Sequence, residues 1–194
     1  MSTARGQRHT APNAVAVPAT APSAPVVAPE PAKRHTISIL VENRFGAFMR
    51  VAGMFAAKGY NLESIAVGRT DEPDISRMTV VTRGEDAVIE QIIRQLDKLI
   101  DTITVVDLTF QPYVERELAL VKVHCTTATR PEIMQIAEIF RAKVVDLSPR
   151  SVTMETTGGQ DKVDAIIRML RPFKILELAR TGRVALKREY QREA

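Results

Sequence analysis

One order of secondary-structure signals occurs twice in this chain, and that repeat constrains the fold more than any other feature. In the first copy, residues 36–41 alternate polar and mostly apolar side chains, as a half-buried strand does. A turn follows, then apolar side chains at helical spacing from Phe48 to Ala56, and Gly59 is placed to end that helix in the left-handed conformation. The later elements predicted for this copy are strands over 62–68 and 75–83, a helix over 88–96 and a strand over 103–110.

The second copy has the same order of elements. Thr129 and Glu132 have the spacing of a capping box, with Pro131 in the first turn of the predicted helix. The elements predicted here are strands over 117–125, 143–147, 151–157 and 175–180, and helices over 133–140 and 163–170. We therefore expect an α+β fold of two tandem ferredoxin-like βαββαβ units, over 34–111 and 112–194. Units this small bury little of their surface, so we expect each to pair with another unit or chain.

The first 33 residues differ from this pattern. Residues 9–29 contain no charged side chain, but five prolines interrupt them, which excludes a membrane-spanning helix. Alanine and proline dominate, so we expect a disordered tail over 1–33. The scarcity of acidic residues also leaves open an organelle-targeting segment, although a cytoplasmic protein is the main expectation.

The charge of the chain is concentrated at its ends. The formal net charge is +4, but the basic excess lies in residues 1–33 and 180–194, and the part between them is close to neutral. A basic nucleic-acid groove is therefore not expected in the folded part. The C-terminal end is predicted to be a solvated tail.

The sequence contains no recognisable catalytic or metal-binding pattern. There is one cysteine, Cys125, which lies in an apolar strand and is expected to be a core thiol. The three histidines lie far apart, and neither a nucleophile elbow nor a phosphate-binding glycine loop is present. We expect no catalytic residue, no metal and no cofactor on this chain, which makes it a binding protein.

The first strand-to-helix turn is the strongest candidate binding site. A helix that begins near Gly46 and Ala47 presents free backbone N–H groups and a positive dipole end, which suits a carboxylate. Asn43 before the helix and Asn61 after it carry amides that can bind either a carboxylate or an ammonium group. These residues indicate a free amino acid as ligand. The alternative is purely structural: Asn43 caps the helix and Gly46 relieves the turn.

Several segments, in order along both halves, resemble one known family. The segment Asn43-x-x-Gly46-Ala47, with GYNLES at 59–64, resembles the ACT domain of the small subunit of acetolactate synthase, also called acetohydroxyacid synthase. Further matching segments lie at 76–79, 91–99, 114–118, 138–141 and 144–146. The resemblance covers the chain from about residue 35 to about residue 186 and excludes the alanine- and proline-rich tail.

The resemblance implies a non-catalytic regulatory subunit. Such a subunit activates a separate catalytic large subunit and confers feedback inhibition by valine in branched-chain amino-acid biosynthesis. Thiamine diphosphate, Mg²⁺ and FAD would belong to the catalytic partner. The family's effector contacts correspond here to Asn43, Gly46, Ala47 and Asn61, and we expect a homodimer formed through the ACT domains, with valine held between chains. Arg44 and Phe45 stand where this family often has smaller or acidic residues.

Two other classes remain open at this point. One is a free-standing amino-acid sensor with an ACT domain, or a regulator that acts on nucleic acid. The other is an acylphosphatase-like enzyme, which would need an arginine in the first loop, and Arg44 is the only candidate there. The corresponding loop of the second unit, 126–131, lacks the Asn-x-x-Gly pattern, so we expect that unit to support assembly.

Overall fold

The computed structural model describes residues 33–189 and contains the predicted repeat. The elements of the first half are β1 (Lys33–Glu42), α1 (Ala47–Lys58), β2 (Leu62–Arg69), β3 (Ile75–Gly84), α2 (Asp86–Leu96) and β4 (Thr102–Asp107). Those of the second half are β5 (Tyr113–His124), α3 (Arg130–Ile139), β6 (Lys143–Leu147), β7 (Ser151–Gly158), α4 (Gln160–Leu170), a 3₁₀ turn (Arg171–Phe173), β8 (Ile175–Arg180) and β9 (Val184–Lys187). The predicted disordered tail lies outside the described residues, except that Lys33 begins β1. No helix within 33–189 is long and apolar enough to cross a membrane.

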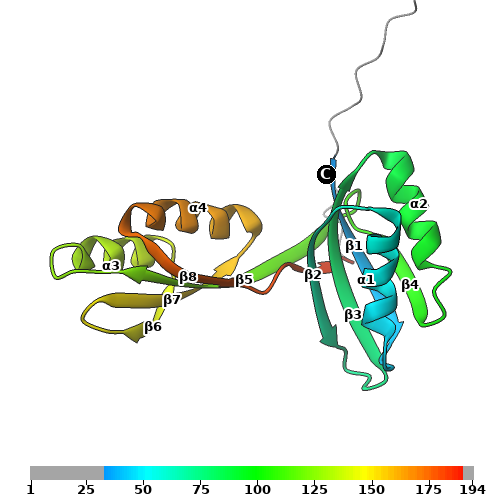
Figure 1. The fold of residues 1–194 in the computed structure, drawn as a ribbon, viewed down its shortest axis with the longest axis horizontal. Coiled ribbons are helices and arrows are strands. Elements are labelled where there is room, and N and C mark those ends of the chain that lie inside the picture. Colours follow the sequence, from blue (N-terminus) through cyan, green and yellow to red (C-terminus); the bar gives the residue numbers. More distant parts are fainter. Residues whose placement is uncertain (1–32, 190–194) are drawn as a thin grey trace, which may run out of the picture. The chain divides into compact units, whose positions relative to one another are not determined.

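Each half forms an antiparallel sheet with two helices on one face (Figure 1). The strand order is β2-β3-β1-β4 in the first sheet and β6-β7-β5-β8 in the second, which confirms the two tandem ferredoxin-like units. Gly59 ends α1 with φ of 68°, as predicted. The predicted capping box is wrong: Thr129 precedes α3 but makes no side-chain capping bond, because its hydroxyl accepts from the backbone N–H of Thr126.

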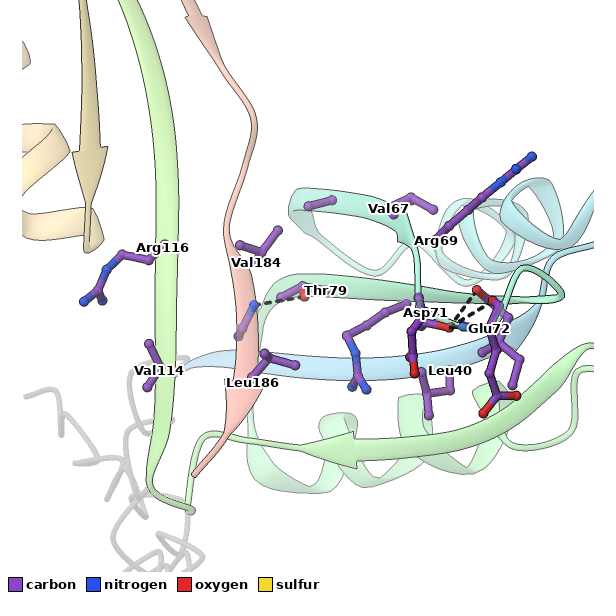
Figure 2. Close-up of a pocket in the computed structure, with 16 residues that line it drawn as sticks. Leu40, Val67, Arg69, Asp71, Glu72, Thr79, Val114, Arg116, Val184 and Leu186 are labelled. Carbon is purple, nitrogen blue, oxygen red and sulfur yellow. Dashed lines mark hydrogen bonds between the residues drawn. The ribbon is translucent and has the colours of Figure 1, made fainter. Parts of the chain in front are cut away.

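Small side chains line the face of the first sheet that its helices leave open. Cross-strand neighbours on this face include Ser38 with Thr79, and Thr79 with Ala66. The start of β5, residues 113–116, pairs with β9, and we call this pair the β5–β9 ribbon. The ribbon lies on the open face, where the backbone N–H of Ala185 donates to Thr79 Oγ1 over 3.2 Å (Figure 2). The small side chains let a backbone approach the sheet this closely.

The ribbon corrects the prediction of a solvated C-terminal tail. Ala185 and Arg183 are buried, and Arg183 Nη1 lies 3.3 Å from Glu115 Oε2. Val184, Ala185 and Leu186 alternate in exposure because β9 has one face on the sheet. The same pairing begins β5 at Tyr113, four residues before the predicted start at 117. The end of the described chain is therefore part of the fold.

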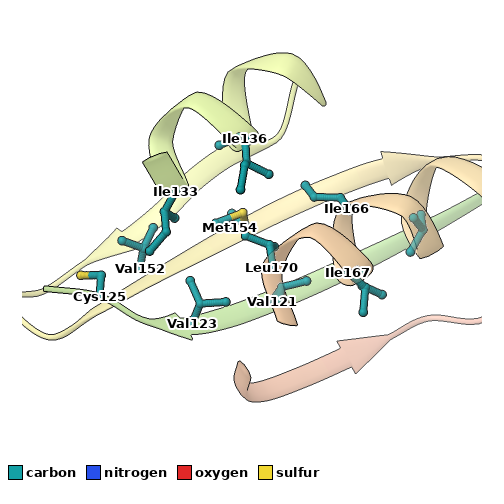
Figure 3. Close-up of a cluster of buried hydrophobic side chains, with 13 residues drawn as sticks. Val121, Val123, Cys125, Ile133, Ile136, Val152, Met154, Ile166, Ile167 and Leu170 are labelled. Carbon is teal, nitrogen blue, oxygen red and sulfur yellow. The ribbon is translucent and has the colours of Figure 1, made fainter. Parts of the chain in front are cut away.

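The second core lies between its sheet and the helices α3 and α4 (Figure 3). Val121 and Val123 of β5 point toward Ile133 of α3 and Ile166 of α4, and all four are fully buried. Cys125 belongs to this core, which confirms the predicted buried thiol. The first core has the same plan, with Ile37, Ile39 and Val41 against α1 and α2.

Candidate functional site

The turn between β1 and α1 is held by the neighbouring β2–β3 turn. The backbone N–H of Asn43 donates to Asp74 O over 2.6 Å, and its side-chain Nδ2 donates to Pro73 O over 2.9 Å. Asn43 is exposed, and no described residue donates to its Oδ1. The side chain does not cap α1 as the structural alternative expected, and its amide nitrogen instead donates to the β2–β3 turn. An oriented amide oxygen therefore faces solvent beside the helix start.

Gly46 is the residue before α1, and its backbone requires glycine. Its φ is 85°, and an added Cβ would lie 3.1 Å from Arg50 Nη1. No side chain caps the helix, and no acidic residue lies in its first turn. The N–H of Ala47 donates to Arg44 O over 3.2 Å, and the positive end of the helix dipole has no acidic side chain in that first turn. Ala47, the next residue, is buried and fixes the helix on the sheet. This is the geometry that a small carboxylate ligand needs.

Arg50 lies near the start of α1 and stabilises the β1–α1 turn that precedes the helix. Its Nε donates to the buried carboxylate of Asp101, and its Nη2 donates to Phe45 O over 3.4 Å. The backbone N–H of Glu42 donates to Asp101 O over 2.8 Å. The hydrogen bond from Arg50 lowers the pKa of Asp101, which keeps this carboxylate ionised as a partner for the arginine. The pair therefore stiffens the turn.

Asn61 lies at the other end of α1 from Asn43. The helix has 12 residues, which corresponds to a length of about 18 Å. The register agrees, because Glu42 pairs with Ile75 at the start of β3, whereas Leu62 pairs with Thr82 near its end. Asn61 is exposed, and its carbonyl accepts from Thr82 Oγ1. One chain therefore brings Asn43, Gly46 and Ala47 together but does not add Asn61 to them.

Exposed apolar side chains surround the start of α1. Phe45 is fully exposed, and Phe48 and Met49 in the first turn are also exposed. The helical spacing placed Phe48 on the apolar face of the first helix, so its exposure is a correction. Such side chains are typical of a surface that another protein covers.

Arg44 does not form an anion cradle. Its Nε lies 2.9 Å from Glu42 Oε2, and most of its side chain is exposed. The arginine candidate for an acylphosphatase-like loop is thus paired with the neighbouring carboxylate of Glu42 at the surface.

Replacing Gly46 and Gly53 by alanine should have opposite effects on stability. Gly46→Ala forces a left-handed conformation on a residue with a Cβ, and we expect a loss of about 1–2 kcal/mol. Gly53 lies within α1, and a Cβ there meets no atom within 4 Å, so Gly53→Ala should stabilise by about 0.5–1 kcal/mol. Urea unfolding of both variants measures the difference. Equal effects would contradict the special role of the Gly46 backbone.

The fold and the turn define a class, a tandem ferredoxin-like protein whose first unit is an ACT domain. The family model described as the AHAS small subunit-like ACT domain matches residues 37–104. The model described as the small subunit of acetolactate synthase matches residues 116–189.

Individual relatives agree with the family models. The acetolactate synthase small subunit of Aquifex aeolicus is 52% identical over 158 residues, which cover 81% of this chain and 82% of the relative. The probable acetolactate synthase small subunit of Archaeoglobus fulgidus is 51% identical over 155 residues, which cover 80% of this chain and 97% of the relative. The crystal structure of the acetolactate synthase small subunit from Thermotoga maritima matches with a TM-score of 0.76 and 39% identity, covering 82% of this chain and 99% of that one. This chain belongs to the family of acetolactate synthase small subunits.

Proposed function

We propose that this chain is the regulatory subunit of a cytoplasmic acetolactate synthase. It activates the catalytic large subunit and mediates feedback inhibition by valine, or a related branched-chain amino acid, in branched-chain amino-acid biosynthesis. The chain itself contributes no catalytic group, and thiamine diphosphate, Mg²⁺ and FAD are held by the large subunit. Residues 34–111 form the effector-binding ACT domain, and residues 112–194 form the C-terminal small-subunit domain.

The observation that carries this proposal is the uncapped start of α1 at Gly46. The backbone N–H groups of the first turn bind the carboxylate of the effector, and Asn43 Oδ1 accepts from its ammonium group. Valine has eight heavy atoms, so its binding free energy is limited to about −12 kcal/mol. Micromolar to millimolar affinity is consistent with that limit and with metabolite sensing.

The second asparagine comes from another copy of the chain. Asn43 and Asn61 lie at opposite ends of α1, so a twofold axis that pairs two ACT domains antiparallel brings Asn43 of one chain next to Asn61 of the other. β2 forms an edge of its sheet, and Phe45, Phe48 and Met49 supply exposed apolar surface for such a pair. The effector site is therefore shared between two chains.

Titration of valine into wild type and Asn43→Ala tests this site. We expect Asn43→Ala to weaken binding by about tenfold or more, because it removes a hydrogen bond to a charged group. Thr127→Ala is the matched control, since Thr127 is exposed in the corresponding β5–α3 loop of the second unit. Equal valine affinity in wild type and Asn43→Ala would overturn the site assignment.

A free-standing amino-acid sensor is the second candidate. The same turn would bind the same class of ligand, but no large subunit would associate with the chain. Co-purification with the large subunit from the host distinguishes the two functions.

A further inference from the structure

A groove runs along the open face of the first sheet beside β9 (Figure 2). Its volume is about 600 Å³, within the range of small-molecule sites. β1, β2 and β3 form its floor, and the β5–β9 ribbon forms one wall. The apolar lining includes Leu40, Ala66, Ile75, Val114, Val184 and Leu186.

The groove stays open because the floor residues from β2 are small and β9 is short. Ala66 and Gly68 of β2 lie across from Thr79 and Arg77 of β3, so β2 places no large side chain on this part of the floor. β9 has four residues and covers only part of the face. Val184 and Leu186 are more than half exposed, which leaves apolar wall accessible to a ligand.

Arg77 supplies a positive charge on the floor of the groove. It is half-buried and lies opposite Leu40 of β1. Its Nη1 donates to Ser38 Oγ over 3.0 Å, and no carboxylate among residues 33–189 is paired with it. A guanidinium offers further N–H donors, and a partly desolvated one favours an anion. Three arginines, Arg77 with the exposed Arg69 and Arg116, and two exposed carboxylates, Asp71 and Glu72, line the groove, so its charged lining is net positive.

We propose that this groove binds a small organic anion with an apolar body, such as a medium-chain carboxylate. The anionic group pairs with Arg77, and the apolar body lies between the sheet and the wall formed by Val184 and Leu186. This site is separate from the proposed valine site, because it lies on the sheet face opposite α1.

One turn connects the groove with the effector site. Residues 70–72 and 75 line the groove, and Pro73 and Asp74 of the same turn accept the two hydrogen bonds from Asn43. The turn is ordered by its own bonds, including Ile75 N–H to Glu72 O over 3.0 Å. A ligand in the groove therefore contacts the element that positions Asn43, and binding at the two sites should be coupled in both directions.

Displacement of the fluorescent anion 8-anilinonaphthalene-1-sulfonate from the full chain tests the groove. Octanoate should displace the probe, and octylammonium, which has the same chain length and the opposite charge, should do so about tenfold less well. Arg77→Gln and Leu186→Glu should each weaken octanoate binding by about tenfold. The second variant changes an exposed side chain, so it leaves the fold intact.

Two matched controls accompany these variants. Arg168→Gln removes an exposed arginine from α4, and Leu176→Glu adds a carboxylate to exposed β8, both away from the groove. Neither should change octanoate binding. The proposal is overturned if octanoate and octylammonium compete equally, if the groove variants behave like the controls, or if added large subunit displaces the probe completely.

Discussion

Replacement of Ala185 by glutamate should destabilise the folded chain by about 3 kcal/mol or more. Ala185 is 2% exposed, and β9 contacts β1 and β3 there. A carboxylate at this position would be buried, and the longer side chain would push β9 away from Thr79, to which the Ala185 N–H now donates. The expected loss of stability would show that β9 packs against the open face of the first sheet.

Val184→Glu is the control for this prediction. Val184 precedes Ala185 on the same strand and is 55% exposed, so the same charge there remains in water. We expect a change of less than about 0.5 kcal/mol. Urea unfolding of the two variants gives the comparison, and equal destabilisation would mean that β9 does not pack on the sheet as described.

Mixing two variants that each bind valine weakly should restore high-affinity valine binding. If the site combines Asn43 of one chain with Asn61 of another, dimers of Asn43→Ala alone or Asn61→Ala alone contain no intact site. A mixed dimer contains one, because the Asn61→Ala chain still supplies Asn43 and its partner still supplies Asn61. Random pairing of equal amounts should therefore recover about a quarter of the wild-type sites.

The variants should be unfolded together, refolded as a mixture and titrated with valine. As a control, the two variants are refolded separately and then combined at low temperature. Without exchange of subunits, this sample contains no mixed dimers. Restored high-affinity binding in the co-refolded sample supports a shared site. No restoration would place the effector within one chain and would contradict the role of the partner's asparagine.

Most of the fold could be predicted because its signals are local. Alternation along residues 36–41 and helical spacing from residue 48 to 56 each need only a few neighbours to be recognised. The fourth strand was predicted to reach Phe110 but ends at Asp107, because Leu108 turns into the interior and donates its N–H to Thr36 O. β9 was missed because four residues between basic side chains carry little signal, and its partner in β5 is about seventy residues away.

The site was predicted in part for the same reason. Gly46 and Asn43 lie in one short turn, and the glycine was placed correctly at the start of α1. The Arg50–Asp101 pair was not found, since it joins residues 51 positions apart and neither has a distinctive neighbour in the sequence. The separation of Asn61 from Asn43 follows from the length of α1, which makes the second chain a geometric requirement of the proposed site.

The most direct test of the central claim is an activity assay of the large subunit. The catalytic subunit of acetolactate synthase from the same host is assayed alone, with this chain, and with this chain plus valine. We predict that the chain raises the activity, that valine lowers it again, and that Asn43→Ala keeps the activation but loses the inhibition. A catalytic subunit whose activity is unchanged by the wild-type chain, with or without valine, would contradict the regulatory function.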